Sequence, residues 1–241
     1  MSYIETIQIR DRDCDIYGRW KPSAMLEAMQ ETAASHCESD GLGRRVLDGQ
    51  GIAWVLSRCR VELNRQPVDG ESLSLETFAL PPRHLFFPRA HVFRDSAGSI
   101  IGGAQSLWLL MDIKSRRAVT NALVKQRLSI EDREAPVGLP ATIRPLNDSP
   151  VEGNLVPAFT EFDLNGHVNN ARYMDWCCNA LGFDALRERE ITGFDVNYDG
   201  ETLPGETLRT SLCRLDDAFT FCGFAGDRRH FAISGRLRPV S

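Results

Sequence analysis

The chain's most informative stretch is Phe162-Asp-Leu-Asn-Gly-His-Val-Asn-Asn-Ala-Arg-Tyr-Met-Asp-Trp176. Asn165 and His167 stand at alternate positions around a glycine, and residues 171–181 carry apolar side chains at helical spacing. The pattern predicts a polar loop that leads into the N-terminus of a helix, with Asn170 as the N-cap. Because the first N–H groups of a helix lack partners within it, they would polarise a carbonyl oxygen placed beside them.

Composition narrows the class of protein. The chain has 241 residues, of which 42% are hydrophobic, enough for the core of one domain or of two small ones. Its net charge of −5 argues against binding to nucleic acid or to an anionic membrane through bulk charge. The seven cysteines show no C-x-x-C spacing, and neither a signal peptide nor a membrane-spanning apolar run is recognisable. We therefore expect a cytoplasmic protein with reduced thiols.

The predicted order of elements occurs twice along the chain. The first half has a strand, a helix and a group of strands, at 3–10, 22–39, 52–63, 72–80, 84–94 and 99–112. The second half repeats this order at 158–162, 171–181, 191–198, 206–214, 219–224 and 230–237, and Gly182 is expected to end its helix. Prolines punctuate the stretch between the halves. We therefore expect an N-terminal domain at 1–130, a linker at 131–157 and a C-terminal domain at 158–241.

Individual residues support a duplication of one α+β unit. Asp163 lies 148 positions after Asp15 (163 − 15 = 148), and Glu206 lies 135 positions after Glu71 (206 − 71 = 135). Each pair occupies the same place in the predicted order of elements. A single sheet would leave an edge open, which a second copy could cover. The sequence thus predicts two copies of a helix wrapped by an antiparallel sheet.

The two halves differ at chemically important positions. At the places of Asn165 and His167 the first half has a tyrosine and Arg19. At the place of Glu201 it has Gln66. Residues that serve the fold should persist in both copies, whereas catalytic residues are needed in only one. This asymmetry predicts that the second half carries the chemistry.

The run at 163–170 resembles the signature of the acyl-ACP thioesterases, the double hot-dog enzymes of bacteria and plant plastids, in which Asp-x-Asn-x-His-Val-Asn-Asn precedes a long helix. The stretches 53–63 and 106–117 look like the family's first-half strands, so the resemblance covers nearly the whole chain. It implies a bacterial member with a double hot-dog fold. It also implies hydrolysis of fatty acyl-ACP to free fatty acid in fatty acid biosynthesis, without cofactor or metal. The partner would be the acyl carrier protein, and a homodimer is compatible with the fold.

The resemblance also implies a role for each polar residue of the motif. Thioester hydrolysis requires a base for the attacking water, stabilisation of an oxyanion and departure of a thiolate. Glu201 or His167 would be the general base, and Asn165 would position the water or the carbonyl. Asp163 would orient Asn165 and His167. The backbone N–H groups of Gly166 and His167 would form the oxyanion site at the start of the helix.

A thiol nucleophile is not expected, because Thr202 follows Glu201 where plant relatives usually carry cysteine. Activated water should therefore attack the thioester. Three alternatives remain at this stage: an acyl-CoA thioesterase of the same fold, a non-catalytic acyl-binding protein of that fold, and, less favoured, a hot-dog dehydratase. Fold alone does not separate them.

Two further features bear on the substrate. The apolar face of the first helix, with Met25, Leu26 and Met29, is either ordinary core or the wall of a fatty-acyl tunnel. The acyl carrier protein is strongly acidic, so the surface that binds it should be basic. The candidate arginines are Arg44-Arg45, Arg58 with Arg60, and Arg116-Arg117.

Overall fold

A computed structural model describes residues 1–146 and 148–240. The chain divides into two compact units. The first consists of Met1–Trp20 and Glu27–Pro140, and the second of Lys21–Leu26 and the residues from Ala141 onward. The division after Pro140 falls within the stretch predicted as a linker, 131–157.

The first half of the chain forms an antiparallel sheet in the order β1-β3-β4-β5-β2, with β6 beside β5. Its elements are β1 (Tyr3–Gln8), η1 (Asp11–Asp13), α1 (Pro22–Ser39), α2 (Arg44–Gly49), β2 (Ile52–Leu63), β3 (Ser72–Ala79), β4 (Phe86–Arg94), β5 (Ile100–Asp112), β6 (Ala118–Val119) and α3 (Ala122–Arg127). The long helix α1 begins at a proline, which suits the first helical turn. It is followed by Gly41, whose φ of +68° suits a helix C-terminus.

The second half forms an antiparallel sheet in the order β8-β11-β10-β9-β7. Its elements are β7 (Val151–Leu155), η2 (Phe159–Glu161), α4 (Arg172–Glu188), β8 (Arg189–Tyr198), β9 (Leu208–Leu215), β10 (Ala218–Ala225) and β11 (Arg228–Pro239). Strand for strand, this is the order of the first half, with β7, β9, β10, β11 and β8 in the places of β1, β3, β4, β5 and β2. The predicted duplication is therefore present in the topology.

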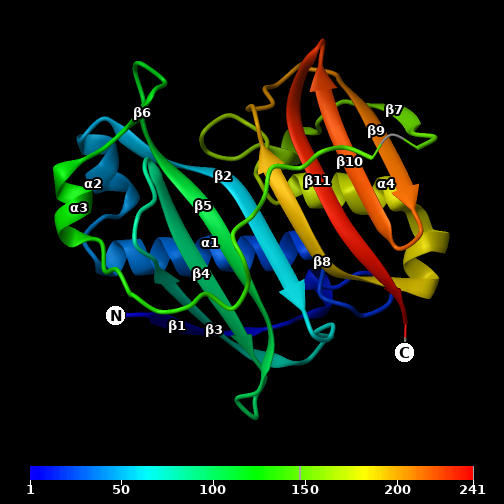
Figure 1. Cartoon of the computed structure of the whole chain (residues 1–241), viewed down its shortest axis with the longest axis horizontal. Helices are drawn as coiled ribbons and strands as arrows, with labels where there is room; N and C mark the ends of the chain where they lie inside the picture. Colours follow the sequence, from blue (N-terminus) through cyan, green and yellow to red (C-terminus); the bar gives the residue numbers. More distant parts are fainter. Residues whose placement is uncertain (147, 241) are drawn as a thin grey trace. The chain divides into compact units, whose positions relative to one another are not determined.

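In each half one long helix packs against the sheet of that half (Figure 1). In the first half, His91 Nε2 of β4 lies 3.2 Å from the carbonyl oxygen of Met29 in α1. In the second half, the rings of Tyr173 in α4 and Phe231 in β11 pack edge to face with centroids 4.9 Å apart. These contacts and the strand orders agree with the predicted pair of α+β units, each with one long helix against an antiparallel sheet.

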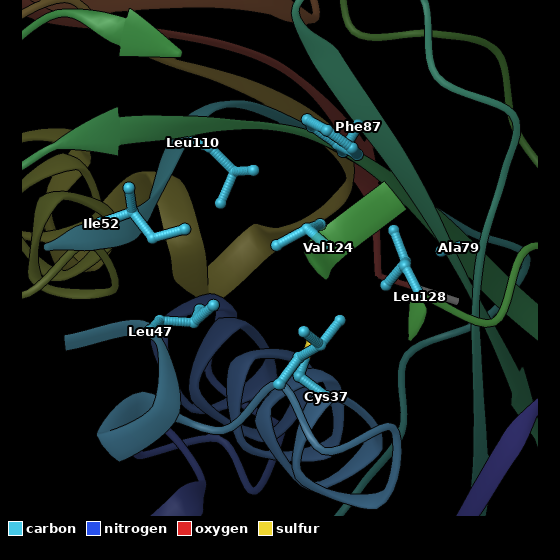
Figure 2. Close-up of a cluster of buried hydrophobic side chains, with 9 residues drawn as sticks. Cys37, Leu47, Ile52, Ala79, Phe87, Leu110, Val124 and Leu128 are labelled. Atoms are coloured by element: carbon cyan, nitrogen blue, oxygen red, sulfur yellow. The ribbon is translucent and has the colours of Figure 1, made fainter. Parts of the chain in front are cut away.

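Two short helices that the sequence did not predict complete the core of the first half. Leu47 of α2 and Val124 of α3 join Leu110 of β5 in one buried cluster at the C-terminal end of α1 (Figure 2). Asn121 caps α3, because its side-chain oxygen accepts hydrogen bonds from two backbone N–H groups of the first turn. Helices of this length show too few turns for a hydrophobic period to be recognised.

Two predicted features before α4 are wrong. Residues 158–162, predicted as a strand, contain the short 3-10 helix η2 (Phe159–Glu161), and the Ala158 N–H donates to the Glu161 carboxylate at 2.6 Å. The strand of this region is β7, which lies inside the stretch predicted as a linker. Its five residues alternate too weakly in hydrophobicity to signal a strand, and it is paired on β9.

The predicted N-cap of α4 is also wrong. Ala171 stands at the N-cap position and no side chain caps the helix, while Asn169 Oδ1 accepts a hydrogen bond from the Ala171 N–H at 2.9 Å in the preceding turn. The carbonyl of Asn170 instead accepts a hydrogen bond from the Tyr198 hydroxyl. Gly182 interrupts the helix as predicted, with φ +81°, but a second helical segment continues to Glu188.

A polar cluster is buried inside the first half, between β4 and α1. Arg89 Nη1 lies 3.0 Å from His36 Nδ1 and 3.3 Å from Thr77 Oγ1. His91 is 1% exposed, and its burial together with the nearby Arg89 guanidinium lowers its pKa to about 3. In the second half Phe221 of β10 occupies the place of His91.

We expect His91 to make the protein sensitive to acid. Its pKa is lower in the folded than in the unfolded chain, where histidine titrates near about 6.5, so the unfolded state takes up the proton first as the pH falls. Stability is then lost below about pH 6.5, by about 1.4 kcal/mol per pH unit. The variant His91→Phe should lose about 2 kcal/mol less than wild type between pH 6.5 and pH 5 in urea titrations.

The control is His84→Gln, because His84 lies exposed in the chain. This variant should keep the pH dependence of the wild type. An identical loss of stability in wild type and His91→Phe would contradict the assignment of acid sensitivity to His91.

Candidate active site

The loop before α4 is held by its own backbone. Phe162 and Val168 form a bridge at its base, the Asp163 N–H donates to the His167 carbonyl at 2.9 Å, and the Gly166 N–H donates to the Asp163 carbonyl at 3.0 Å. Gly166 has φ +81°, a left-handed conformation that favours glycine. The glycine between the two polar residues is thus required by the turn.

The carboxylate of Asp163 organises the side chains of this loop. It accepts hydrogen bonds from the backbone N–H of Asn165 at 2.8 Å and from its side-chain amide at 3.2 Å. One oxygen also lies 3.8 Å from His167 Nδ1. Asp163 therefore contacts both of the residues that the sequence predicted it to orient.

Glu201 approaches the other side of the same imidazole. Its Oε1 lies 3.4 Å from His167 Nε2, and the two side chains are 33% and 24% exposed. The backbone brings them together, because the Val168 N–H donates to the Thr202 carbonyl at 3.0 Å. The structure thus gathers the four predicted side chains, and the imidazole of His167 has a carboxylate beside each ring nitrogen.

The predicted oxyanion donors differ in their surroundings. The Gly166 N–H is already used within the turn, where it donates to the Asp163 carbonyl. Of the predicted pair, the His167 N–H therefore stays the candidate donor. Sequence reasoning could not foresee this, because the loop's internal hydrogen bonds depend on its folded backbone.

The first half contains the same loop with other side chains. The Asp15 N–H donates to the Arg19 carbonyl at 2.8 Å, and the Gly18 N–H donates to the Asp15 carbonyl at 3.0 Å. In place of an imidazole, the Arg19 guanidinium donates to the Asp15 carboxylate at 3.0 Å. The backbone of the loop therefore belongs to the fold, while the imidazole belongs to the second half alone.

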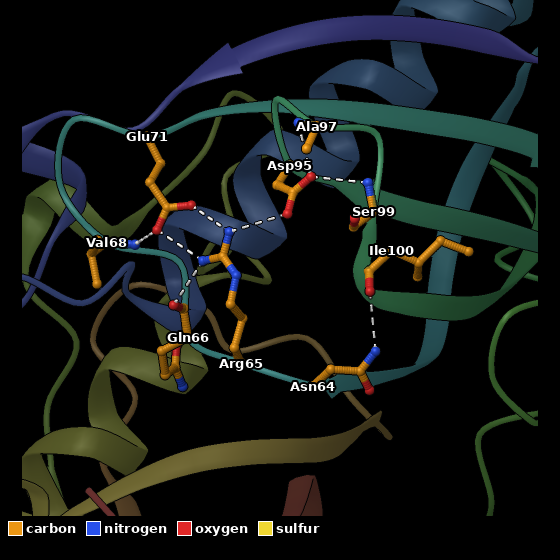
Figure 3. Close-up of polar contacts among 9 residues, drawn as sticks. All are labelled: Asn64, Arg65, Gln66, Val68, Glu71, Asp95, Ala97, Ser99 and Ile100. Carbon is orange, nitrogen blue, oxygen red and sulfur yellow. Dashed lines mark hydrogen bonds and ion pairs between the residues drawn. The ribbon is translucent and has the colours of Figure 1, made fainter. Parts of the chain in front are cut away.

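The turn that carries Glu201 also has a counterpart (Figure 3). In the first half Glu71 accepts hydrogen bonds from the Val68 N–H at 2.9 Å and from the Arg65 guanidinium at 2.7 Å. In the second half Glu206 accepts a hydrogen bond from the Leu203 N–H at 2.7 Å. These matching contacts show that Glu201 and the first-half glutamine at the same place stand on equivalent turns.

Sequence reasoning missed a buried group behind Glu201. The Tyr173 hydroxyl donates to Thr202 Oγ1 at 3.1 Å, and Thr202 Oγ1 lies 3.1 Å from His230 Nδ1. Burial lowers the pKa of His230. Nothing in the local sequence of β11 marks this histidine as part of a site. Comparison with the first half at the same positions would have singled it out.

Within residues 1–146 and 148–240, no group of three or more His, Cys, Asp or Glu side chains is arranged to hold a metal ion. In the same part of the chain, no helix is both long and apolar enough to span a lipid bilayer. Every cysteine is a free thiol, and burial raises the pKa of Cys222 to about 11.

Two family profiles match the chain. The profile described as "Acyl-ACP thioesterase N-terminal domain" matches residues 1–124, and "Acyl-ACP thioesterase C-terminal domain" matches residues 146–224. The chain belongs to the acyl-ACP thioesterase family. The second of these profiles covers the Asp163–His167 loop and Glu201.

Known proteins show the same relationship. The chain is 25% identical over 218 residues to the chloroplastic acyl-[acyl-carrier-protein] hydrolase FATB3 of Cuphea viscosissima, a match that covers 83% of the chain and 52% of that protein. An acyl-ACP thioesterase from Bacteroides thetaiotaomicron superposes with a TM-score of 0.90 at 23% identity, over 98% of both chains. The 12:0-ACP thioesterase from Umbellularia californica gives 0.87 at 22% identity, over 99% of this chain and 98% of that one.

The superposed structures establish the fold of the chain, whereas the sequence relatives match it over only part of their length. The two structures confirm the double hot-dog fold of this acyl-ACP thioesterase family member. The chain spans about half the length of the curated relatives it matches. The reaction and its substrate are therefore argued from the residues of the site.

The two equivalent aspartates allow a test of the loop's structure. Asp163→Ala removes the hydrogen bonds from Asn165 and should lower the free energy of unfolding by about 1–3 kcal/mol. Asp15→Ala should cost more, because it also removes the carboxylate beside the nearly buried Arg19 guanidinium. Urea titration of both variants measures the difference.

Asp184→Ala is the matched control, since the Asp184 side chain is 97% exposed and its ion pair lies on the surface. This change should stay within about 0.5 kcal/mol of wild type. If Asp163→Ala were as stable as the control, Asp163 would not organise the loop.

Proposed function

We propose that the chain hydrolyses the thioester of fatty acyl-ACP and releases a free fatty acid, as a cytoplasmic enzyme of fatty acid biosynthesis. The observation that carries the proposal is the imidazole of His167 between the carboxylates of Asp163 and Glu201. A histidine between two carboxylates beside a helix start offers candidate bases, the ring and the carboxylates, together with the polar surroundings that acyl transfer to water requires.

The geometry favours Glu201 over His167 as the group that takes the proton from water. Both ring nitrogens of His167 face a carboxylate oxygen, at 3.8 Å for Asp163 and 3.4 Å for Glu201. Nε2 has the nearer carboxylate, so a neutral imidazole is best satisfied with its one N–H on Nε2, directed at Glu201, and then has no lone pair on that side for water. In this mechanism His167 orients the Glu201 carboxylate, whose other oxygen accepts the proton.

The remaining steps use the loop and the helix start. Asn165 lies in the same loop, held by Asp163, and would place the water or the thioester carbonyl. The His167 N–H and the positive end of α4 would stabilise the negative charge that develops on the carbonyl oxygen. Collapse of this oxyanion intermediate expels the thiolate, a good leaving group.

Substitution of the two central residues tests this mechanism. In single-turnover hydrolysis of an acyl-ACP, Glu201→Gln should lower the rate by about 10²–10⁴-fold, because an amide cannot accept the proton. His167→Gln should also lower the rate, since the Glu201 carboxylate loses the group that orients it. Quenched-flow measurement of released fatty acid gives both rates.

Glu152→Gln is the matched control, because Glu152 lies on β7, is about half exposed and belongs to another part of the second half. It should hydrolyse the substrate at the wild-type rate. Near-normal rates for both Glu201→Gln and His167→Gln would remove the proposed site.

We expect the protein to recognise the acyl carrier protein as well as the acyl chain that it carries. The names of the relatives refer to acyl-ACP substrates. For one acyl chain presented on both carriers, we expect a higher kcat/KM with ACP than with coenzyme A. We also expect reversal of charge at one of the arginine pairs, Arg44-Arg45, Arg58 with Arg60, or Arg116-Arg117, to raise KM for acyl-ACP about fivefold, equivalent to ~1 kcal/mol.

Arg187→Glu provides the control for the charge reversals, because Arg187 is an exposed arginine of α4 outside these pairs. Its KM should match that of the wild type. Unchanged KM for all three pairs would discard the basic docking surface, and equal kcat/KM for both carriers would favour the acyl-CoA thioesterase alternative.

A further inference from the structure

A chain of hydrogen-bonded side chains is buried in the second half and takes no part in the chemistry proposed above. It runs from the Tyr173 hydroxyl of α4 to Thr202 Oγ1, at 3.1 Å, and from there to His230 Nδ1 of β11, at 3.1 Å. Tyr173, Thr202 and His230 are 2%, 0% and 4% exposed. Three elements thus meet through polar groups in the interior.

This buried chain adjoins both members of the proposed catalytic pair. Thr202 directly follows Glu201 in the sequence. Its carbonyl accepts the hydrogen bond from Val168, which directly follows His167. Thr202 is therefore linked covalently to one partner and through a single hydrogen bond to the segment of the other.

The first half shows which of these contacts the fold itself needs. There the Trp20 N–H donates to the Pro67 carbonyl at 2.9 Å, in the same place as the bond between Val168 and Thr202. The backbone contact is thus common to both halves. Proline at that place has no hydroxyl, so the side-chain hydrogen bonds of Thr202 have no counterpart.

The other two members are replaced as well. Tyr173 lies 148 positions after Met25 (173 − 25 = 148), the offset of the two loops and helices. His230 and Ile101 are equivalent because each carbonyl accepts a hydrogen bond from the residue that follows the paired strand, at 2.8 Å in both halves. The first half therefore has methionine, proline and isoleucine where the second has tyrosine, threonine and histidine.

The fold is compatible with apolar side chains at all three places, and burial of polar groups is unfavourable unless they are paired. The polar set occurs in the half that has the imidazole and the glutamate. We propose that Tyr173, Thr202 and His230 are positioning residues that fix the Glu201 carboxylate against His167. This inference rests on the proposed function and names further residues that serve the same site.

Thr202 Oγ1 accepts a hydrogen bond from the Tyr173 hydroxyl and forms a second one with His230 Nδ1, in which the tautomer of the ring decides the donor. The Glu206 carboxylate lies 3.9 Å from the same ring nitrogen. The threonine side chain is then held from two sides. Because it is β-branched and fully buried, its rotamer and the adjoining backbone have little freedom. Glu201 projects into the site from this immobilised segment.

Kinetics of matched variants test the proposal. Thr202→Val keeps the shape of the side chain and removes the hydroxyl, and Tyr173→Phe removes the donor. With acyl-ACP, each should lower kcat by about ten- to one-hundredfold while KM changes little, because misplacement of the catalytic group affects the reaction more than binding. Thr202→Ser restores a hydroxyl and should recover most of kcat.

Thr220→Val is the control for the loss of a buried threonine hydroxyl. Thr220 is 5% exposed on β10, and its Oγ1 accepts a hydrogen bond from the Leu146 N–H at 3.0 Å. This variant should lose stability and keep the kcat of the wild type. If Thr202→Val and Thr220→Val had the same kcat, or if Thr202→Ser were as slow as Thr202→Val, the positioning role would be overturned.

A second measurement does not depend on turnover. In carbon–proton correlation NMR spectra, the ring signals of His167 should shift in Thr202→Val and should not shift in Thr220→Val. Unmoved His167 signals in Thr202→Val would overturn the inference even with an active enzyme. If the wild-type protein hydrolysed no acyl-ACP, the proposed function would be wrong. The NMR spectra alone would then test whether Thr202 positions the Glu201 and His167 side chains.

Discussion

The hydrogen bond from the Val168 N–H to the Thr202 carbonyl joins the two segments on which the site depends. One segment is the loop before α4, and the other is the turn between β8 and β9. His167 directly precedes Val168 and Glu201 directly precedes Thr202, so the two side chains start from neighbouring points of the backbone. A contact of 3.4 Å between His167 and Glu201 follows from that geometry. The rest of the site is arranged around these two side chains.

The first half has the equivalent hydrogen bond, from the Trp20 N–H to the Pro67 carbonyl, where it joins two segments of the fold. There the loop is closed by an ion pair between Asp15 and Arg19, whose guanidinium is nearly buried. A nearly buried cation needs such a partner, so this ion pair has a structural role. In the second half a smaller imidazole replaces the guanidinium. A second carboxylate, that of Glu201, lies on the far side of this imidazole, and we propose that the pair transfers the proton.

The interiors of the two halves also differ, but at these places the first half has the polar side chains and the second has apolar ones. Beneath α1, Arg89 and His91 of β4 are buried among polar groups, whereas β10 has Phe219 and Phe221 at the equivalent places. Arg89 lies beside His36 in the last turns of α1, where the negative end of the helix dipole favours a cation. Each half therefore has buried polar side chains at places where the other half has apolar ones.

Much of the architecture followed from local patterns. The long helix α1 and the strands β2 to β5 have strong periodicity and clear end signals, so their existence and approximate bounds could be predicted. The repeated order of elements predicted the duplication. Three weakly patterned segments, α2, α3 and β7, were not predicted because they are short. The N-cap position of α4 is Ala171 rather than Asn170, because the backbone of the preceding turn, rather than residue type, decides where the helix begins.

The amino-acid sequence by itself determined the candidate residues Asp163, Asn165, His167 and Glu201, because a loop motif and a duplicated turn are local features that a second copy makes visible. Only the tertiary structure decided that His167 lies between two carboxylates and that the Gly166 N–H is already engaged. It also decided that a buried tyrosine, threonine and histidine stand behind Glu201. These relations join residues far apart in the chain, and their distances depend on how the strands and the helix pack.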